Sequence, residues 1–210
     1  TEKMFLERIL NLNQYSSLSE QYISFVQVGG AYSHKYKPLL DFLKIKTLIF
    51  TDIDYQKSLT SIAEIQDSEI TNEGLKSYYS RSEKTLQVKD LYEWQQTNPN
   101  IRLFYQTGKD GYTRTLEEAI LNKCFSINVE DKESVKFWKE KRESKRLRYS
   151  IPKKDTTNNE KNSNLSVREI VNATNDKKTD FMYSIILQDD DKVSEFIPNY
   201  IEEGLNWLIQ

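Results

Sequence analysis

The fold is decided by the stretch Lys46-Thr47-Leu48-Ile49-Phe50-Thr51-Asp52-Ile53-Asp54, in which an apolar run leads directly into two carboxylates. The apolar residues 48–50 are consecutive rather than alternating, which is typical of a strand covered on both faces in a parallel sheet. Side chains two positions apart on an extended chain lie on the same side, so Asp52 and Asp54 are expected to project together from the carboxyl end of this strand. In open α/β sheets, ligands bind at that edge.

Two carboxylates this close repel each other unless a cation lies between them, and their hard oxygen atoms suit Mg²⁺, Mn²⁺ or Ca²⁺. The pattern therefore predicts a divalent-cation site. Asp189 and Asp191 repeat the same spacing, but they lie in a short acidic run within a polar stretch. A solvated loop is the expected structure there. The apolar strand before Asp52 is what distinguishes the first pair from the second.

Composition limits the class of protein. A chain of 210 residues can form one substantial core, or one domain with a smaller appendage. With 37% hydrophobic and 30% charged residues, and no apolar run near the ~18 residues of a membrane span, a cytoplasmic protein without a membrane partner is expected. One cysteine and one histidine exclude an internal disulfide and a Cys/His zinc site, so any metal must be held by oxygen. The net charge of −2 gives no overall nucleic-acid signature.

The first fifty residues follow an α/β order. Residues 2–12 place apolar side chains at helical spacing, Tyr22–Val28 has the composition of a strand, and Pro38 suits the first turn of the next helix. The strand at 48–50 follows, so a parallel sheet with right-handed crossovers is predicted. Gly29-Gly30 could cradle a phosphate, but a tight strand-to-helix turn is the favoured interpretation.

A second strand is predicted at Ile101–Tyr105, followed by a turn and a helix from Thr115 to about Lys123. Thr115 and Glu118 have the spacing of a capping box, in which each satisfies a free N–H group of the other. That structural role for Glu118 leaves Glu117 available for chemistry.

A basic segment follows at residues 132–154, where ten Lys/Arg stand against three Glu and aromatic residues are interleaved. Such a segment could follow a phosphate backbone and stack bases, or it could be a solvated helix face with ordinary aromatic anchors. Residues 153–164 are polar and predict a flexible loop, and three helical patterns follow it. The candidate DNA-binding residues are Arg114, Lys141, Arg142, Lys145 and Arg146.

Six motifs, taken in order, resemble the C-terminal TOPRIM region of the OLD-family (overcoming lysogenization defect) nucleases, and they span nearly the whole chain. The resemblance implies a TOPRIM-like parallel sheet flanked by helices over residues 1–128 and a helical subdomain over 129–210. The motifs are Thr1-Glu2-Lys3, Val28-Gly29-Gly30, Phe50-Thr51-Asp52-Ile53-Asp54, Arg114-Thr115-Leu116-Glu117-Glu118-Ala119, Lys178-Thr179-Asp180-Phe181 and the closing Pro198–Leu208.

The resemblance implies a set of site residues. Asp52 and Asp54 match the family's Asp-x-Asp metal ligands, Glu2 matches an acid for a second metal, and Glu117 is a candidate further ligand. Lys178 matches the lysine that the family places near the scissile phosphate, with the adjacent Lys177 as the alternative. Without the resemblance, a lysine at 178 would more often be a surface group.

The chain also departs from the family pattern. The family's TOPRIM region begins with a strand ending in Glu-Gly, and its second acid follows four positions later. Glu2 matches that second acid, whereas the first acid and its strand would lie upstream of Thr1. Family members carry an N-terminal ABC-type ATPase domain, and they include the nuclease subunit of the Gabija antiphage system. The resemblance therefore implies DNA, that ATPase domain, a homo-oligomer and a helicase-like protein as partners, with ATP acting only through the ATPase domain.

The implied activity is DNA phosphodiester hydrolysis with two Mg²⁺ or Mn²⁺ ions per site. Other interpretations remain open. They are an RNA-cleaving TOPRIM nuclease, a topoisomerase that takes its tyrosine nucleophile from a separate domain, a catalytically silent DNA-binding or assembly module, and an α/β regulatory domain in which Asp52 and Asp54 only cap a loop.

Overall fold

The computed structural model describes residues 2–29, 32–56, 59, 61–79, 85–127, 134–149 and 164–210. Its helices and strands are α1 (Glu2–Leu10), η1 (Asn13–Tyr15), α2 (Ser16–Ser19), η2 (Ser33–Tyr36), α3 (Lys37–Leu43), β1 (Thr47–Phe50), α4 (Ile62–Asp67), α5 (Glu73–Tyr79), α6 (Val88–Tyr92), β2 (Ile101–Phe104), η3 (Gly108–Asp110), α7 (Leu116–Phe125), β3 (Ser134–Lys136), α8 (Trp138–Ser144), β4 (Asn164–Ser166), α9 (Val167–Asp176), α10 (Lys178–Ile186), α11 (Asp190–Ser194) and α12 (Asn199–Ile209).

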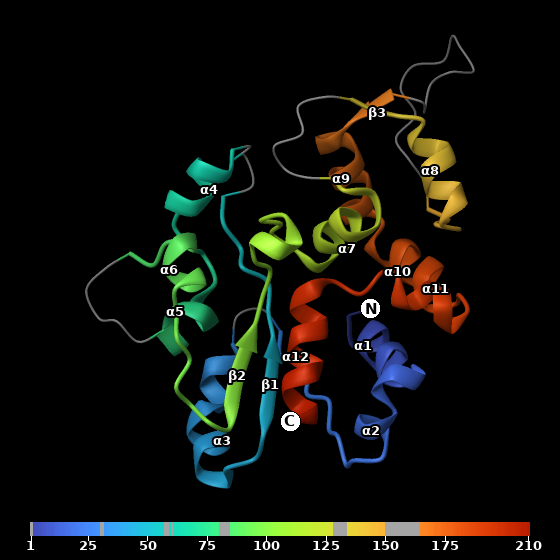
Figure 1. Ribbon diagram of the computed structural model, residues 1–210. Coiled ribbons are helices and arrows are strands. Elements are labelled where there is room, and N and C mark those ends of the chain that lie inside the picture. Colours follow the sequence, from blue (N-terminus) through green and yellow to red (C-terminus); the bar gives the residue numbers. More distant parts are fainter. Residues whose placement is uncertain are drawn as a thin grey trace.

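Strands β1 and β2 form a parallel pair in which Thr47 lies opposite Ile101 and Phe50 opposite Phe104. The pair lies between α12 on one side and the α4–α6 group on the other (Figure 1). Phe50 contacts the Tyr200 ring of α12 edge-on, with 6.0 Å between ring centroids, whereas Ile49 packs into the opposite cluster. Because both faces carry helices, an unbroken apolar run suits β1. The predicted α/β class is confirmed.

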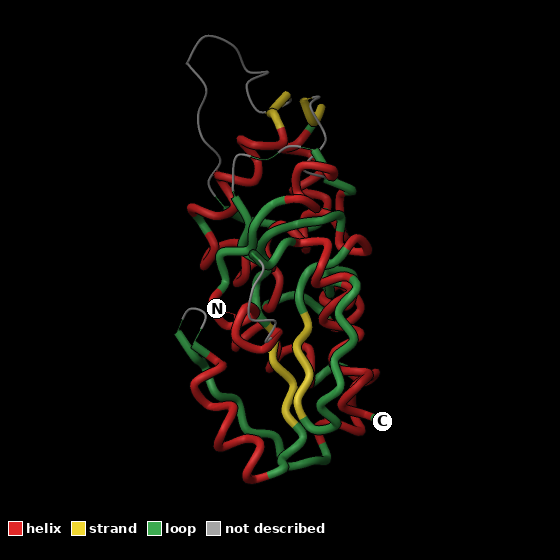
Figure 2. The backbone as a smooth tube through the Cα atoms, turned by 90° about the vertical axis from the view of Figure 1, so that its left-hand side faces the viewer, coloured by secondary structure: helices red, strands yellow, loops and turns green. Residues whose placement is uncertain are grey.

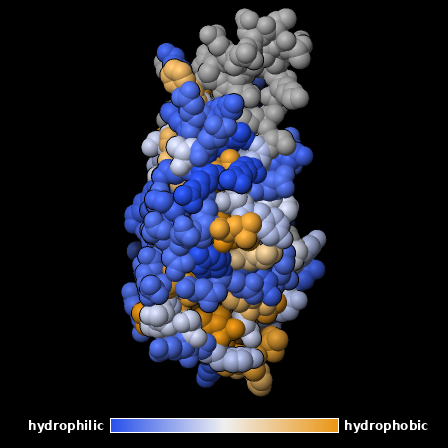
Figure 3. Space-filling view, turned by 90° about the vertical axis from the view of Figure 1, so that its right-hand side faces the viewer, coloured by the Kyte–Doolittle hydropathy of each residue, from blue (hydrophilic) through white to orange (hydrophobic). Residues whose placement is uncertain are grey.

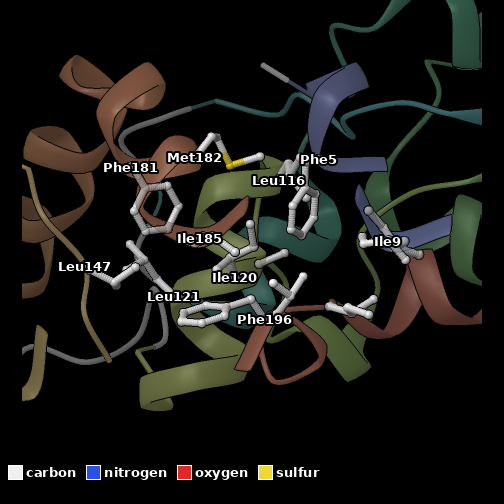
Figure 4. Packing of buried hydrophobic residues seen from close by; sticks show 14 of the residues in the cluster. Phe5, Ile9, Leu116, Ile120, Leu121, Leu147, Phe181, Met182, Ile185 and Phe196 are labelled. Atoms are coloured by element: carbon white, nitrogen blue, oxygen red, sulfur yellow. The ribbon is translucent and has the colours of Figure 1, made fainter. Parts of the chain in front are cut away.

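The larger hydrophobic cluster surrounds α7. Side chains from α1, α10 and the segment before α12 meet those of α7 in the closely packed centre that Figure 4 shows. This one cluster draws on residues before and after position 128, where the sequence predicts a domain boundary, and that boundary stays a prediction. The labelled members are Phe5, Ile9, Leu116, Ile120, Leu121, Leu147, Phe181, Met182, Ile185 and Phe196.

The second cluster fills the space between the sheet and α4–α6, where Ile65, Leu75 and Leu91 are buried against Leu103 of β2. The outer edge of β2 is closed by a side chain. Gln96 donates from Nε2 to the Leu103 carbonyl and accepts the Leu103 N–H at Oε1, each at 2.8 Å. The side-chain amide thus takes the place that a further strand would occupy.

The other edge of the sheet is different. Thr47 and Thr51 donate their backbone N–H groups toward the β2 side. Because backbone groups alternate in direction along a strand, the N–H and C=O groups of Leu48 and Phe50 point away from β2. Among the described residues β1 has no second strand partner. Helix α3 lies to one side of the strands (Figure 2), has no buried residue and leaves Phe42 80% exposed. The described residues therefore leave this edge of the sheet without a strand partner.

The predicted strand at Tyr22–Val28 is wrong. The segment forms no strand, although its half-buried residues Ile23 and Phe25 alternate with exposed neighbours and pack on the larger cluster. Tyr22 is 98% and Val26 70% exposed. The composition and period of a strand are present, but a strand also requires a backbone partner, and the described residues supply none.

Other local predictions have mixed outcomes. Pro38 lies in the first turn of α3, as expected. Asp190 and Asp191 begin helix α11 instead of forming a loop, and Asp190 pairs with Arg8 at 2.6 Å. The short antiparallel pair β3–β4 was not predicted.

Gly30 and residues 153–163 of the predicted loop lie outside the described residues, while Asn164 begins β4. Within the described part of the chain, no helix combines the length and the apolar character needed to cross a membrane.

Gly204 allows α12 to approach the sheet closely. A Cβ atom at this position would lie 2.7 Å from Cε1 of Phe50 and 3.0 Å from Cδ1 of Leu48, whereas one at Gly29 would meet nothing within 4 Å. Overpacking lowers the free energy of unfolding by roughly 1–3 kcal/mol, and the higher helix propensity of alanine offsets about 1 kcal/mol of that loss. We expect Gly204→Ala to lower the free energy of unfolding in urea and Gly29→Ala to leave it within about 0.5 kcal/mol of wild type. Equal effects of the two substitutions would contradict this packing.

Candidate functional site

Asp52 lies just beyond the carboxyl end of β1 and is held by two donors. Its Oδ1 atom accepts a hydrogen bond from Gln106 Nε2 at 2.7 Å and another from the backbone N–H of Leu116 at 3.1 Å. The pKa of Asp52 is raised to about 7, mainly by burial and to a smaller extent by the carboxylates of Glu117, Asp54 and Glu2, against the lowering effect of the Gln106 hydrogen bond. Asp52 thus lies in a strongly negative environment.

Glu117 supplies much of that negative charge. It lies in the first turn of α7, which Thr115 caps by accepting the N–H of Glu118. Its side chain is 1% exposed, and the Nζ atom of Lys178, at the start of α10, lies 3.1 Å from Oε2. Apart from the Lys178 ammonium, no group in the described part of the chain donates a hydrogen bond to either carboxylate oxygen of Glu117. The ion pair with Lys178 therefore leaves this buried carboxylate incompletely satisfied.

Lys178 responds to the same group of acids. Partial burial alone would lower its pKa, but the carboxylates of Glu117, Asp52 and Glu2 raise the pKa above its ordinary value. Lys178 is thus a stable cation beside the acids. The predicted alternative, Lys177, precedes α10 and is exposed.

Asp54 is oriented differently from Asp52. Its φ of 49° places it in the left-handed region. The extended chain that would put the Asp52 and Asp54 side chains on the same side therefore does not continue through Asp54. One Asp54 oxygen lies 3.6 Å from Nη2 of Arg114, and Nε of Arg114 donates to the Tyr55 carbonyl at 2.8 Å. Arg114, a candidate DNA-binding residue, thus contacts Asp54 and the backbone carbonyl of Tyr55.

Glu2 and Glu118 complete the set of acids near the site. Glu2 begins α1 and is exposed, and its charge raises the pKa values of Asp52 and Lys178. Glu118 is buried and accepts the N–H of Arg114 at 3.1 Å, rather than that of Thr115 as a full capping box requires. Glu118 therefore accepts a backbone N–H at the start of α7, as predicted, but that of Arg114 instead of Thr115. Glu117 pairs with Lys178.

Three of the four candidate DNA-binding residues in the basic segment make contacts within the protein. Arg142 donates to the Tyr149 carbonyl and lies 5.2 Å from the centre of the Tyr149 ring, while Lys145 pairs with Glu195. Arg146 lies 3.9 Å from Asp189, and Lys141 is exposed. The face seen in Figure 3 is largely hydrophilic with a few apolar patches.

Three residues around the carboxylates were not singled out from the sequence. Gln106 binds Asp52, and Asn72 donates to the Asp52 carbonyl at 2.7 Å. Burial and the nearby acids, Asp52 first among them, raise the pKa of Tyr200 well above its ordinary value. Of these three residues, only Gln106 could have been identified from the sequence, because it lies two residues after β2 just as Asp52 lies two residues after β1.

The residues present suit a hard divalent cation. Glu117 offers two buried oxygens whose one donor among the described residues is the Lys178 ammonium, and Asp52 offers a carboxylate beside it. Among the described residues, however, no three Asp, Glu, His or Cys side chains are grouped closely enough to hold one ion. Mg²⁺ commonly binds through one or two carboxylates and keeps several waters. The donor chemistry thus fits such an ion, with water, substrate or further residues supplying the remaining ligands.

Comparison with known proteins points in the same direction. Residues 1–54 match the family described as overcoming lysogenization defect protein-like, TOPRIM domain. The chain is 26% identical over 222 residues to "Endonuclease GajA" of Bacillus cereus (strain HuB5-5), covering 99% of this chain and 30% of that protein. No solved structure matches the chain. These findings confirm the predicted resemblance to the OLD-family TOPRIM region, and the matched segment includes Glu2, Asp52 and Asp54.

The Lys178–Glu117 pair yields a first prediction for this site. Lys178→Met should lower the free energy of unfolding by about 1–3 kcal/mol in a metal-free buffer, because it leaves a buried carboxylate without a cation. Water screens the 40% exposed lysine, so a larger loss is not expected. The double variant Lys178→Met/Glu117→Gln should recover part of the loss. Urea unfolding measures both, and equal stability of the single and double variants would contradict the pairing.

The raised pKa of Asp52 yields a second prediction for this site. An unfolded aspartate titrates near pH 4, whereas this one titrates at about 7 when folded. Between these values the unfolded chain has released a proton that the folded chain keeps, so the contribution of Asp52 to stability falls as pH rises from about 4 to 7. Asp52→Asn should therefore lose less stability over this range than the wild type does. Urea unfolding in chelator at pH 5 and pH 8 tests it, and parallel changes in both proteins would disprove it.

Proposed function

We propose that this chain, with its OLD-type TOPRIM region, is the nuclease part of a larger ATPase–nuclease and hydrolyses DNA phosphodiester bonds. One observation carries the proposal. The buried, incompletely satisfied Glu117 lies beside Asp52 and Lys178, at the end of a strand inside the TOPRIM match. The relative at 26% identity is named an endonuclease, which supports the same chemistry.

The four acids are proposed to supply the anionic oxygens of the centre. Asp52 and Asp54 follow β1, Glu117 comes from α7 and Glu2 from α1, so three elements contribute. When bound, Mg²⁺ or Mn²⁺, proposed as two ions per site, would promote ionisation of an attacking water and neutralise charge on the phosphate. No side-chain nucleophile is required.

Lys178 is proposed to place a fixed positive charge where negative charge develops on the phosphate. Its Nζ atom lies against Glu117, so it can serve the substrate only when Glu117 is neutralised by another cation. Loss of such a charge in a water-poor site costs about 10²–10³ in rate. Lys178 would thus act in transition-state stabilisation rather than as a base.

A further ligand is proposed to come from a strand upstream of Thr1 that ends in Glu-Gly. The open edge of β1 supports this placement, since the backbone of Leu48 and Phe50 faces away from β2. A strand added there would bring its carboxyl end close to Asp52.

The chain spans 30% of the length of the curated relative it matches, so the whole protein's properties are also proposals. They are an N-terminal ABC-type ATPase domain through which ATP acts, a homo-oligomer, a helicase-like partner protein, a cytoplasmic location and a role in phage defence.

The decisive test is cleavage of supercoiled plasmid with Mg²⁺ or Mn²⁺ by this chain and by a form extended upstream by about twenty residues, enough for one strand and its turn. We expect cleavage by the extended form and its loss in Asp52→Ala, with fold and DNA binding retained. The control is Asp67→Ala, which removes a 68% exposed acid of α4 and should leave cleavage unchanged.

Continued Mg²⁺-dependent cleavage by a folded Asp52→Ala protein would defeat the assignment. Cleavage of structured RNA with plasmid left intact would favour an RNA-cleaving nuclease. Inactivity on both substrates in a folded, extended protein would favour a binding or assembly role.

A further inference from the structure

Gln106 lies directly opposite Asp52. The parallel register pairs Phe50 with Phe104, and two residues further along each chain are Asp52 and Gln106. Gln106 is completely buried. A buried amide next to a carboxylate at the end of a sheet is costly unless each of its polar atoms has a partner.

The orientation of the Gln106 amide follows from its two partners. Its Oε1 atom accepts the backbone N–H of Ile53 at 3.0 Å, and its Nε2 donates to Oδ1 of Asp52 at 2.7 Å. A flipped amide would set NH₂ against N–H and a carbonyl oxygen against a carboxylate. Both contacts would be repulsive, so Gln106 can face Asp52 only as a donor.

The second donor to Asp52 comes from another element. The backbone N–H of Leu116, at the start of α7, also donates to Oδ1 at 3.1 Å. Two donors on one oxygen hold the carboxylate plane between β2 and α7. Within the described part of the chain no hydrogen bond engages Oδ2, so this oxygen is the one left for a ligand.

We propose that Gln106 is a positioning residue that presents Oδ2 of Asp52 to a divalent cation. The inference rests on the proposed function. A neutral donor suits this task, because a lysine or arginine at 106 would neutralise Asp52 and repel the cation, and a glutamate would add negative charge to an already acidic centre. Partners that orient a metal ligand in this way typically contribute 10–100-fold to metal affinity.

The chain offers a matched control in Gln96. Gln106 and Gln96 each make two hydrogen bonds through the side-chain amide, but those of Gln96 go to the backbone of Leu103 at the outer edge of β2. Replacing either residue by methionine keeps the side-chain length and removes two bonds. The two variants therefore differ mainly in whether Asp52 loses a partner.

The experiment measures Mn²⁺ binding by calorimetry and unfolding in urea for wild type, Gln106→Met and Gln96→Met. It uses the form of the chain, with or without the upstream strand, that binds Mn²⁺ more tightly. We expect Gln106→Met to weaken binding by about 10–100-fold and Gln96→Met to change it by less than about threefold, with comparable losses of stability. If Gln106→Met does not fold, Gln106→Asn, which is one methylene too short to reach both partners, should show the same selective loss.

The outcomes separate the two proposals. Wild-type binding that Gln106→Met and Gln106→Asn leave within threefold, or an equal loss in Gln96→Met, would overturn the positioning role alone. A wild-type chain that binds no Mn²⁺ in either form would overturn the proposed metal centre, and the role of Gln106 with it.

Discussion

Burial of negative charge at the end of β1 is the constraint on which the rest of this arrangement depends. Glu117 is almost inaccessible to water, and Asp52 is held between a side chain and a helix N-terminus. Charges in such a place cost several kcal/mol each unless cations and donors compensate them. The compensation comes from three elements: Lys178 from α10, Gln106 from the end of β2 and the first N–H of α7. Packing of these elements is thus required before the acids can lie together.

Local sequence signals were enough for the parts of the fold that depend on local structure. The apolar run before Asp52 predicted β1 and the packing of helices on both of its faces, and Thr115 marked the start of α7 at the correct residue. The parallel pairing of β1 with β2 followed from the α/β order. In each case the deciding information lies within about ten residues of sequence, or in the order of elements along the chain.

The remainder depends on contacts between distant residues. Tyr22–Val28 has a strand's composition, but whether it forms one depends on a backbone partner elsewhere. Asp54 follows Asp52 at the spacing of a strand, yet the chain turns there. The ion pair of Glu117 with Lys178 joins residues about sixty positions apart, and only the family resemblance had linked them. The partner of a side chain across the core cannot be predicted from the residues next to it in the sequence.

The left-handed backbone at Asp54 restricts evolution at this position in two independent ways. Glycine, asparagine and aspartate are the residues that adopt such a conformation most readily, and of these only aspartate carries a charge. Glutamate would keep the charge and strain the backbone, while glycine would relieve the strain and lose the charge. Under the proposed function, a lineage that abandoned metal chemistry could therefore drift here toward glycine or asparagine. One that kept the proposed chemistry would have almost no freedom at this residue.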